Sequence, residues 1–561
     1  MSSNYPSLRR PTTATPLAIN LKTTATMNLN EASGVRSLAT LLLHTDEQEQ
    51  ASDLTYSKYM EYSTKVRRTL THANSQEEAL MTIDSLKRLG IDYIFRQEIT
   101  SIINSFYVRH GETYMGPSGD LFQVTLAFRL LREAGYDVSS DIFDRFTDSR
   151  GDFNPSLSQD IRGILSLHDA SYLNKGEDVL YKANEFAAKH LKSSISNLEP
   201  NLAALVTHTL DHPYHMSLQQ YKSCYHLSYR QGCFGRNSSA MEELAAMDFN
   251  LNQLLHQKEL EQIASWWRNS RLAEELPLAR DQLQKWYFFS TILLPDPQFS
   301  EYRIQLAKAI AFIYLIDDIY DVMGSLDELS LFTEAIDKWE HPDSISLPHY
   351  MKACYKALYD VTNQIADTIS QERGWNPINS MKKSWAKLCN AFMVEARWFT
   401  AKQVPMTSTY LKNAVISTGL HIVLVHIFFL IGQGITKETV EVIESDPGLI
   451  TCPATILRLW DDLGSAKDEN QEGFDGSYID CYMKENPQCS VDDAREHVMD
   501  LISKTWEALN KECFSSRLFS PDFIQASLNS ARMARVAYSY DDQQRLPMLE
   551  EYVKLLLSGK K

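Results

Sequence analysis

The sequence predicts an all-α protein, and three observations support this class. From about Asp53 onward the apolar pattern is helical, and β-type alternation is rare. Ser75-Gln76-Glu77-Glu78-Ala79-Leu80 has the polar cap of a helix start. The apolar run Ile422–Ile431 is about half as long as the ~20 residues of a membrane-spanning helix, so it predicts a buried core helix and no membrane span. The 561 residues are enough for more than one such domain.

The first 45 residues differ from the rest of the chain in composition. They are rich in Ser and Thr and contain one acidic residue, Glu31. Their Lys and Arg residues are Arg9, Arg10, Lys22 and Arg36. This composition is typical of a plastid transit peptide, so we expect residues 1–45 to direct the protein to the chloroplast. The alternative is a disordered tail that carries no targeting signal. Translation from an internal start at Met27 would shorten the segment and leave a form of the protein in the cytoplasm.

Three carboxylates occur within five residues in Asp317-Asp318-Ile319-Tyr320-Asp321, directly after the apolar run Ala309–Ile316. At helical spacing Asp317 and Asp321 share one face, with Asp318 one position round. Like charges at that place are costly to bury unless a cation compensates them. Mg²⁺ prefers hard oxygen ligands and commonly takes one or two carboxylates together with substrate phosphates. The cluster therefore predicts a Mg²⁺ site, with a solvated acidic helix end as the simpler alternative.

Ser417-Thr418-Gly419 comes shortly before the apolar run Ile422–Ile431. Gly and hydroxyl residues bend helices and expose backbone carbonyls, so a helix break is expected here. His426 lies inside the apolar run, and we interpret it as a core histidine rather than a metal ligand.

A second set of oxygen donors lies further along the chain. Asp461, Ser465 and Glu469 follow one another at spacings of four residues, so one helical face would carry all three. Arg458 precedes Asp462 by one turn and would meet an anion held by the metal. An ordinary polar stripe explains this set alone. Two oxygen clusters on separate helices together predict a diphosphate held between two sets of Mg²⁺ ligands.

Composition excludes several other classes. The net charge of −17 argues against a general nucleic-acid binder, which needs a basic surface. The eight Cys form no CxxC pair, which predicts reduced thiols. The 15 His residues form no HExxH pattern, so no zinc site is expected. We expect the protein to act as a monomer.

The two clusters resemble the metal-binding motifs of plant class I terpene synthases. The first matches the family's DDxxD motif, and the second matches its NSE/DTE motif, (N/D)D(L/I/V)x(S/T)xxxE. Further matching segments are Asp120–Arg132, Gly135–Ser139, Met247–Asn250, Trp266-Trp267 and Leu326–Leu329. The resemblance implies two helical domains: an N-terminal helical domain at 50–255 and a C-terminal metal-binding catalytic domain with the class I terpenoid synthase fold at 256–561.

The resemblance also implies a ligand set and a mechanism. The metal ligands would be Asp317, Asp318, Asp321, Asp461, Ser465 and Glu469, holding about three Mg²⁺ ions, with Mn²⁺ as an alternative. Arg280 and Arg458 would join Asp317, Asp321 and Asp461 in binding the diphosphate of geranyl or farnesyl diphosphate. Ionisation would leave an allylic cation between aromatic walls, for which Trp286–Phe289 are candidates, and the break at Ser417–Gly419 would direct carbonyls toward it.

Departures from the family pattern bear on the product. The family's RxR loop reads Arg280-Asp281-Gln282 here, so its second cation is missing. A lysine and a pocket tryptophan of the family are replaced by Ser477 and Phe289. Fewer cations should hold the released diphosphate less tightly, and a leaving group held close steers isomerisation before ring closure. Together with the segment Tyr538–Asp542, in which Tyr538 would be catalytic, these changes resemble the clade of linalool and nerolidol synthases, which make acyclic tertiary alcohols.

Other functions remain open at this point. A cyclic monoterpene or sesquiterpene synthase would share both metal motifs. A trans-prenyl diphosphate synthase would show two DDxxD motifs, whereas the second cluster here has the Ser/Glu pattern. A non-catalytic helical scaffold predicts no Mg²⁺-dependent release of diphosphate. A class II cyclase is disfavoured because the chain contains no DxDD motif.

Overall fold

The computed structural model describes residues 46–110, 119–219, 222–223, 239–465, 477–539 and 547–558. It divides into two compact units, Met1–Met60 and Glu61–Lys561. The described residues form helices joined by turns and loops, with one isolated β-bridge between Thr147 and Phe153, so the predicted all-α class is confirmed. The predicted transit segment 1–45 lies outside the described residues.

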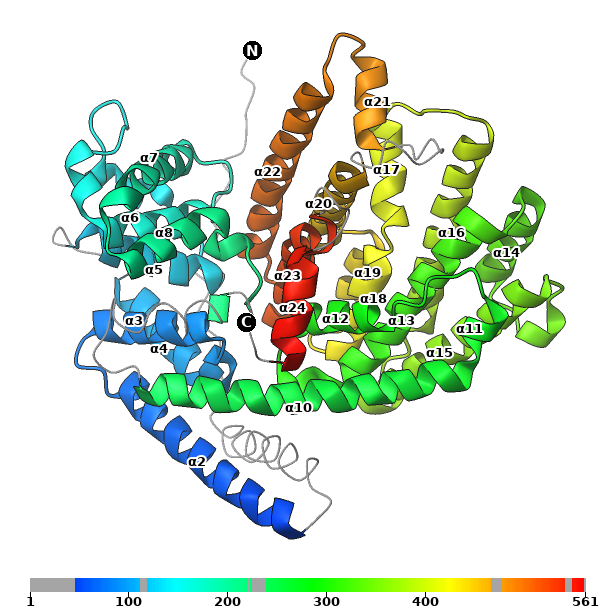
Figure 1. Ribbon diagram of the computed structural model, residues 1–561, viewed down its shortest axis with the longest axis horizontal. Coiled ribbons are helices and arrows are strands. Elements are labelled where there is room, and N and C mark those ends of the chain that lie inside the picture. The colour runs from blue at the N-terminus through cyan, green and yellow to red at the C-terminus, as the bar shows by residue number, and fades with distance from the viewer. Residues whose placement is uncertain are drawn as a thin grey trace, which may run out of the picture. The chain divides into compact units, whose positions relative to one another are not determined.

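The helices of the first half are α2 (Asp46–Thr71), α3 (Gln76–Leu89), α4 (Arg96–His110), α5 (Leu121–Glu133), α6 (Ile161–Ser171), α7 (Asp178–Ser194) and α8 (Pro200–Asp211) (Figure 1). The predicted helix start at Ser75 is confirmed: its hydroxyl accepts a hydrogen bond from the Glu78 amide at 3.1 Å. Gly90 ends the same helix in the left-handed conformation, with φ +75°.

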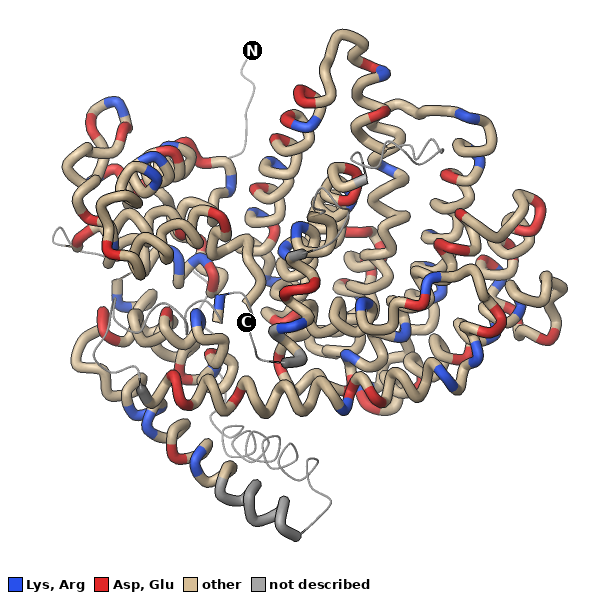
Figure 2. Tube along the Cα trace, viewed as in Figure 1, with Lys and Arg blue, Asp and Glu red and all other residues tan. Residues whose placement is uncertain are grey.

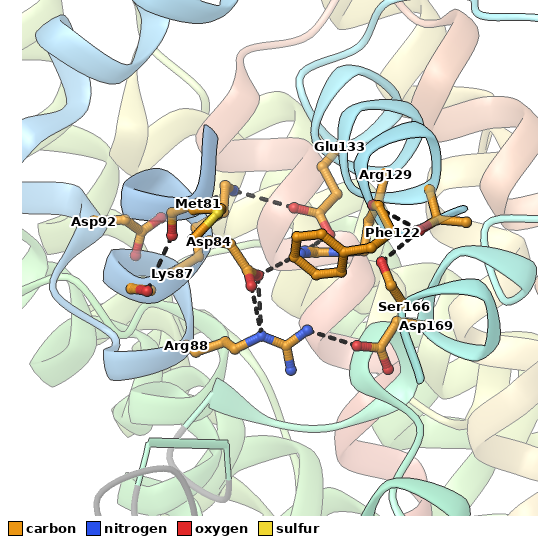
Figure 3. Close-up of polar contacts among 12 residues, drawn as sticks. Met81, Asp84, Lys87, Arg88, Asp92, Phe122, Arg129, Glu133, Ser166 and Asp169 are labelled. Atoms are coloured by element: carbon orange, nitrogen blue, oxygen red, sulfur yellow. Dashed lines mark hydrogen bonds and ion pairs between the residues drawn. The ribbon is translucent and has the colours of Figure 1, made fainter. Parts of the chain in front are cut away.

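A buried charge network joins three of these helices (Figure 3). Arg129 on α5 is 1% exposed and pairs with Asp84 on α3. Arg88, also on α3, bonds Asp169 on α6 at 2.6 Å. Because removing one partner of a buried ion pair leaves an uncompensated charge, this network fixes how α3, α5 and α6 pack.

The helices of the second half are α10 (Ser239–Ser270), α11 (Leu272–Glu275), α12 (Leu283–Leu293), α13 (Ser300–Asp318), α14 (Leu326–Lys338), α15 (His349–Arg373), α16 (Ile378–Thr400), α17 (Thr407–Ser417), α18 (Leu420–Ile431), α19 (Lys437–Glu444), α20 (Gly448–Ser465), α21 (Tyr478–Glu485), α22 (Val491–Ser515), α23 (Pro521–Tyr538) and α24 (Pro547–Ser558). The predicted domain boundary at 255–256 falls inside the continuous helix α10 and stays a prediction. Figure 2 shows acidic and basic residues interspersed along the described helices.

The helix α18 is the apolar centre of this second group. All of its residues, Leu420–Ile431, are buried, and it packs against α13, α16, α20 and α23 (Figure 1). In the described part of the chain no single helix is long and apolar enough to cross a membrane, although the pair α17 and α18, bent by 41°, passes that test together by length and composition. His426 is 1% exposed, and its Nδ1 bonds the Ile422 carbonyl at 2.8 Å, as a core histidine does.

A second buried ion pair positions the helices that carry the site. Arg303 on α13 is fully buried and donates from Nε to Glu259 on α10 at 2.8 Å. Tyr287 on α12 donates its hydroxyl to the same carboxylate at 2.8 Å. The carboxylate of Glu259 therefore holds α10, α12 and α13 in one arrangement, well away from the acidic end of α13.

Candidate active site

The first acidic cluster lies where α13 changes its geometry. Asp317 and Asp318 are the last residues of α13, and the π-helical turn η8 (Ile319–Met323) follows. The Gly324 amide bonds the Ile319 carbonyl at 2.9 Å, which closes this wider turn. Asp321 lies in the turn and is exposed, so the simple α-helical spacing expected between Asp317 and Asp321 is modified. Single π-turns are frequent at functional sites.

Arg280 binds both carboxylates at the end of α13. Its backbone amide donates to Asp318 Oδ2 at 2.7 Å, its Nε lies 2.7 Å from Asp318 Oδ1, and its Nη2 bonds Asp317. Burial raises the pKa of Asp317, the Arg280 guanidinium lowers it, and the neighbouring Asp318 raises it again, with a net upward shift. Burial therefore disfavours the charged form of Asp317, and a nearby cation would favour it.

The second cluster lies on the last two turns of α20. Arg458 Nη1 donates to Asp461 Oδ2 at 3.2 Å and lies 3.7 Å from Asp462 Oδ1, and the expected contact of Arg458 with an anion held by the metal stays a prediction. Ser465, one turn after Asp461, is the last residue of the helix as described. Glu469 lies outside the described residues, and its assignment as a ligand remains a prediction.

Asp462 has a different role from its neighbour Asp461. It is 3% exposed and accepts hydrogen bonds from the Tyr410 hydroxyl at 3.0 Å to each oxygen and from the Tyr478 amide at 2.9 Å. Burial raises the pKa of Asp462 to about 7. These contacts tie α20 to α17 and α21, so Asp462 anchors the helix. Asp461 is the more accessible carboxylate of the two, with 28% of its side chain exposed.

The predicted helix break is confirmed at Thr418-Gly419. Helix α17 ends at Ser417, α18 begins at Leu420, and Gly419 between them has φ +69°. A Cβ at Gly419 would lie 2.6 Å from Ile313 Cγ2, so the break is pressed against α13 one turn before Asp317. Arg458 Nη2 donates to Ser417 Oγ at 3.2 Å, which connects the break to the second cluster.

Sequence reasoning missed Glu395 on α16. Its Oε1 accepts hydrogen bonds from Ser417 Oγ at 2.6 Å and from Asn413 Nδ2 at 3.1 Å. Burial raises the pKa of Glu395, Arg458 lowers it and Asp317 raises it, so this carboxylate lies within the field of both clusters. The sequence could have pointed to Glu395, because this acidic residue follows the buried Leu388 and Phe392 at helical spacing on the same face of α16.

The structure brings the two clusters into one electrostatic neighbourhood. Arg458 of the second cluster lowers the pKa of Asp317 in the first. Lys285 on α12 is influenced by both: burial lowers its pKa, Arg280 of the first cluster lowers it too, and Asp461 of the second raises it. A separate pocket of about 420 Å³ is lined by parts of α17, α18 and α20, including Lys412, His421 and Thr451, and by none of the predicted ligands.

The aromatic run on α12 is divided between two roles. All of Trp286–Phe289 are buried. The Tyr287 hydroxyl is engaged by His256 and Glu259, so this residue belongs to the packing of α10. Phe289 lies beneath the Lys285 ammonium at 5.7 Å, on the side of the charged cluster. Tyr538 is the last residue of α23 and half-buried, and its catalytic role remains a prediction.

The donor types fit a hard divalent cation. Asp317, Asp321 and Asp461 present carboxylate oxygens, and Asp318 shares the arginine that holds Asp317. Within the described ranges, no group of three or more His, Cys, Asp or Glu side chains is arranged to hold a metal ion by itself. The structure thus supplies oxygen donors from two helices, and the predicted set adds Ser465 and Glu469 to them.

Two family models match the chain. The model described as "Terpene synthase family, metal binding domain" matches residues 268–508, and "Terpene synthase, N-terminal domain" matches residues 38–210. An (E)-nerolidol synthase of Cannabis sativa is 46% identical over 90% of this chain and 92% of the relative. An S-(+)-linalool synthase, chloroplastic, of Arabidopsis thaliana is 41% identical over 86% of this chain and 84% of the relative.

Solved structures share the whole fold. The isoprene synthase of grey poplar (Populus x canescens), in complex with three Mg²⁺ ions and dimethylallyl-S-thiolodiphosphate, superposes with a TM-score of 0.83. It is 34% identical in sequence, and the match covers 90% of this chain and 97% of that one.

Proposed function

The chain belongs to the terpene synthase family, and from that premise we propose that it converts geranyl or farnesyl diphosphate into an acyclic tertiary alcohol, linalool or nerolidol. Metal-dependent ionisation of a prenyl diphosphate is the general activity of this family. The observation that carries the proposal is the pairing of an arginine with a carboxylate in each cluster: Arg280 with Asp317, and Arg458 with Asp461. The nerolidol and linalool synthases among the relatives support the choice of product.

The metal ligands in this proposal are Asp317, Asp318, Asp321, Asp461, Ser465 and Glu469. When bound, Mg²⁺ supplies positive charge that stabilises the developing charge of the leaving diphosphate. The upward-shifted pKa of Asp317 supports this assignment, because burial disfavours its charged form and a bound cation would favour it.

The protein's own residues bind and position the substrate. Arg280 and Arg458 donate charge-assisted hydrogen bonds to the diphosphate oxygens. The allylic C–O bond then breaks, both of its electrons leave with the diphosphate, and a delocalised cation remains. Phe289 and the other apolar walls exclude bulk water and stabilise the cation through their ring faces. One admitted water attacks the tertiary carbon, and its excess proton passes to the released diphosphate.

The acyclic outcome follows from weak retention of the diphosphate. Gln282 is neutral at the place of the second arginine of the loop. Ser477, at the place of a family lysine, caps α21: its hydroxyl accepts from the Asp480 amide at 3.2 Å. An anion held by fewer cations departs before the isomerisation and recapture that precede ring closure, so water capture dominates.

The test is product analysis by gas chromatography on the purified full chain, with each diphosphate supplied separately with Mg²⁺. We expect linalool from geranyl diphosphate and nerolidol from farnesyl diphosphate, with neither formed after chelation by EDTA. Predominantly cyclic products would refute the acyclic route and leave the family activity intact. A longer prenyl diphosphate, formed when isopentenyl diphosphate is added, would indicate chain elongation. The absence of any diphosphate release would indicate a scaffold.

The compartment would decide which alcohol forms. We propose that residues 1–45 direct the protein to the chloroplast, where geranyl diphosphate would give linalool. The linalool synthase of Arabidopsis thaliana is named as chloroplastic, which supports targeting to the chloroplast. A fusion of residues 1–50 to a fluorescent protein is expected to accumulate in plastids. A diffuse cytoplasmic signal would reverse the preference toward farnesyl diphosphate and nerolidol.

A further inference from the structure

Gln282 is a neutral residue close to the first cluster, at the place where the family's loop has its second arginine. It directly precedes α12, two residues after Arg280, and its side-chain Oε1 is enclosed without a hydrogen-bond partner. An enclosed amide oxygen there repels an anion rather than attracting one. The side chain is neutral, so if the diphosphate lies against Arg280, the position of Gln282 adds no positive charge to hold it.

Lys285 follows Gln282 by three residues, in the first turn of α12. Its ammonium lies near the same aromatic ring as Arg280. Its Nζ lies 5.4 Å from the centre of the Tyr314 ring. The guanidinium carbon of Arg280 lies 5.1 Å from the centre of that same ring. Tyr314 precedes Asp317 by three residues on α13, so Arg280 and Lys285 are two cations that meet at one ring beside the first acidic cluster.

The ammonium of Lys285 has no neutralising partner among the described residues. No ion pair or hydrogen bond joins it to a carboxylate there, and its close contacts are the faces of Tyr314 and Phe289. Burial and the neighbouring Arg280 lower the pKa of Lys285 to about 8, against an opposing influence of Asp461. A half-buried cation that lies over two ring faces, within the electrostatic influence of Arg280 and Asp461, is in a position to accept an anionic ligand.

We propose that Lys285 replaces the missing second arginine of the loop and donates a hydrogen bond to the diphosphate of the bound substrate. This inference rests on the proposed function and adds a residue to its site. An ammonium is a compact charge with three rotatable donors, whereas an arginine offers a fixed bidentate fork. Lys285 therefore supplies charge for ionisation, and it constrains the released anion less than the arginine of the family's loop would.

The experiment compares variants of the full chain by two readouts. Calorimetry measures binding of inorganic diphosphate in the presence of Mg²⁺, and steady-state kinetics measures kcat/KM for geranyl diphosphate. We expect Lys285→Met and Lys285→Gln to weaken diphosphate binding and lower kcat/KM at least tenfold, while Lys285→Arg stays within threefold of wild type. Gln282→Arg, added to Lys285→Met, should restore most of the lost binding, because it returns a cation to the loop.

Lys308→Met is the matched control. Lys308 is also a buried lysine over an aromatic ring, 5.9 Å from the centre of Trp266, but it lies on α13 nine residues before Asp317. Wild-type binding and kinetics in this variant would show that loss of a buried lysine has no general effect. Wild-type diphosphate binding in folded Lys285→Gln, or no rescue by Gln282→Arg, would overturn the role of Lys285. A wild-type protein that releases no diphosphate from either substrate would instead refute the proposed function.

Discussion

Arg458 donates a hydrogen bond to the hydroxyl of Ser417, with 3.2 Å between Nη2 and Oγ. The other terminal nitrogen of the same guanidinium bonds Asp461 at 3.2 Å. The Ser417 hydroxyl in turn donates a hydrogen bond to Glu395 Oε1 at 2.6 Å. One arginine therefore connects the second carboxylate cluster to the helix break directly and to the carboxylate of α16 through Ser417.

Replacing Arg458 with lysine should harm catalysis although the charge is kept. Lysine cannot bond Asp461 and Ser417 simultaneously from two nitrogens of a planar fork and still face the diphosphate. We expect kcat/KM to fall tenfold or more, which corresponds to about 1.4 kcal/mol of transition-state stabilisation. Steady-state kinetics on Arg458→Lys checks this, and wild-type values would show that Arg458 does not contact the diphosphate.

Replacing Asp317 with alanine should remove most turnover and leave the fold intact. Burial raises the pKa of Asp317 although Arg280 lowers it, so its charged form is disfavoured in the metal-free protein, and Arg280 keeps two contacts with Asp318 when Asp317 is removed. We expect circular dichroism and the melting temperature to match wild type or improve, while product formation with Mg²⁺ nearly disappears. The exposed Asp327→Asn on α14 is the control and should remain active. Near-normal turnover in Asp317→Ala would contradict the metal assignment.

Gly419→Ala should destabilise the protein more than Gly374→Ala does. Both glycines are left-handed, with φ +69° and φ +70°, so both substitutions carry a backbone penalty of about 1–2 kcal/mol. A Cβ at Gly374 meets nothing within 4 Å, whereas one at Gly419 lies 2.6 Å from Ile313. Overpacking should add about 1–3 kcal/mol at Gly419. Thermal unfolding measures the difference, and equal losses would show that α17 and α18 separate from α13 without cost.

His426→Leu should make stability less sensitive to acid. Burial lowers the pKa of His426 to about 4, so between pH 6.5 and pH 4 the unfolded chain binds a proton that the folded chain does not. Stability therefore falls as the pH drops through this window, by about 2 kcal/mol at pH 5 from this group alone. Leucine removes that contribution while keeping an apolar side chain in α18.

The free energy of unfolding, measured in urea at pH 7.5 and pH 5, is the readout for His426→Leu. The decrease between the two pH values should be about 2 kcal/mol smaller than in wild type. His341→Gln is the control, because the side chain of His341 is 68% exposed. An unchanged pH dependence in His426→Leu would mean that burial does not lower the pKa of His426 in the folded protein.

Local sequence patterns predicted most of the fold. The spacing of apolar residues predicted helices from Asp53 onward, and Ser75 caps α3 as expected. Ile422–Ile431 is a buried helix, and the chain breaks before it at Thr418-Gly419. These features depend on residues close together in the chain, because helix periodicity, caps and left-handed glycines act over one or two turns.

The carboxylates and arginines of the site were visible in the sequence, but their partners were not. Asp461 and Asp462 are adjacent on α20. The packing of α17 and α21 around Asp462 buries its carboxylate, whereas the Asp461 carboxylate stays partly exposed. Glu395 and Lys285 carry no motif of their own. Their proximity to the site comes from packing: α12 lies against α13, and α16 lies against η8 and α17.

The sequence by itself determined the all-α class, the two oxygen-rich clusters and the helix break, because each depends on residues that lie within a few helical turns of one another in the chain. Only the tertiary structure decided that Arg280 bridges Asp317 and Asp318, that the last turn of α13 widens, and that Lys285 and Arg280 meet at Tyr314. The physical reason is that helical periodicity sets which face of a helix a residue occupies, while the packing of buried side chains sets which other helix that face meets.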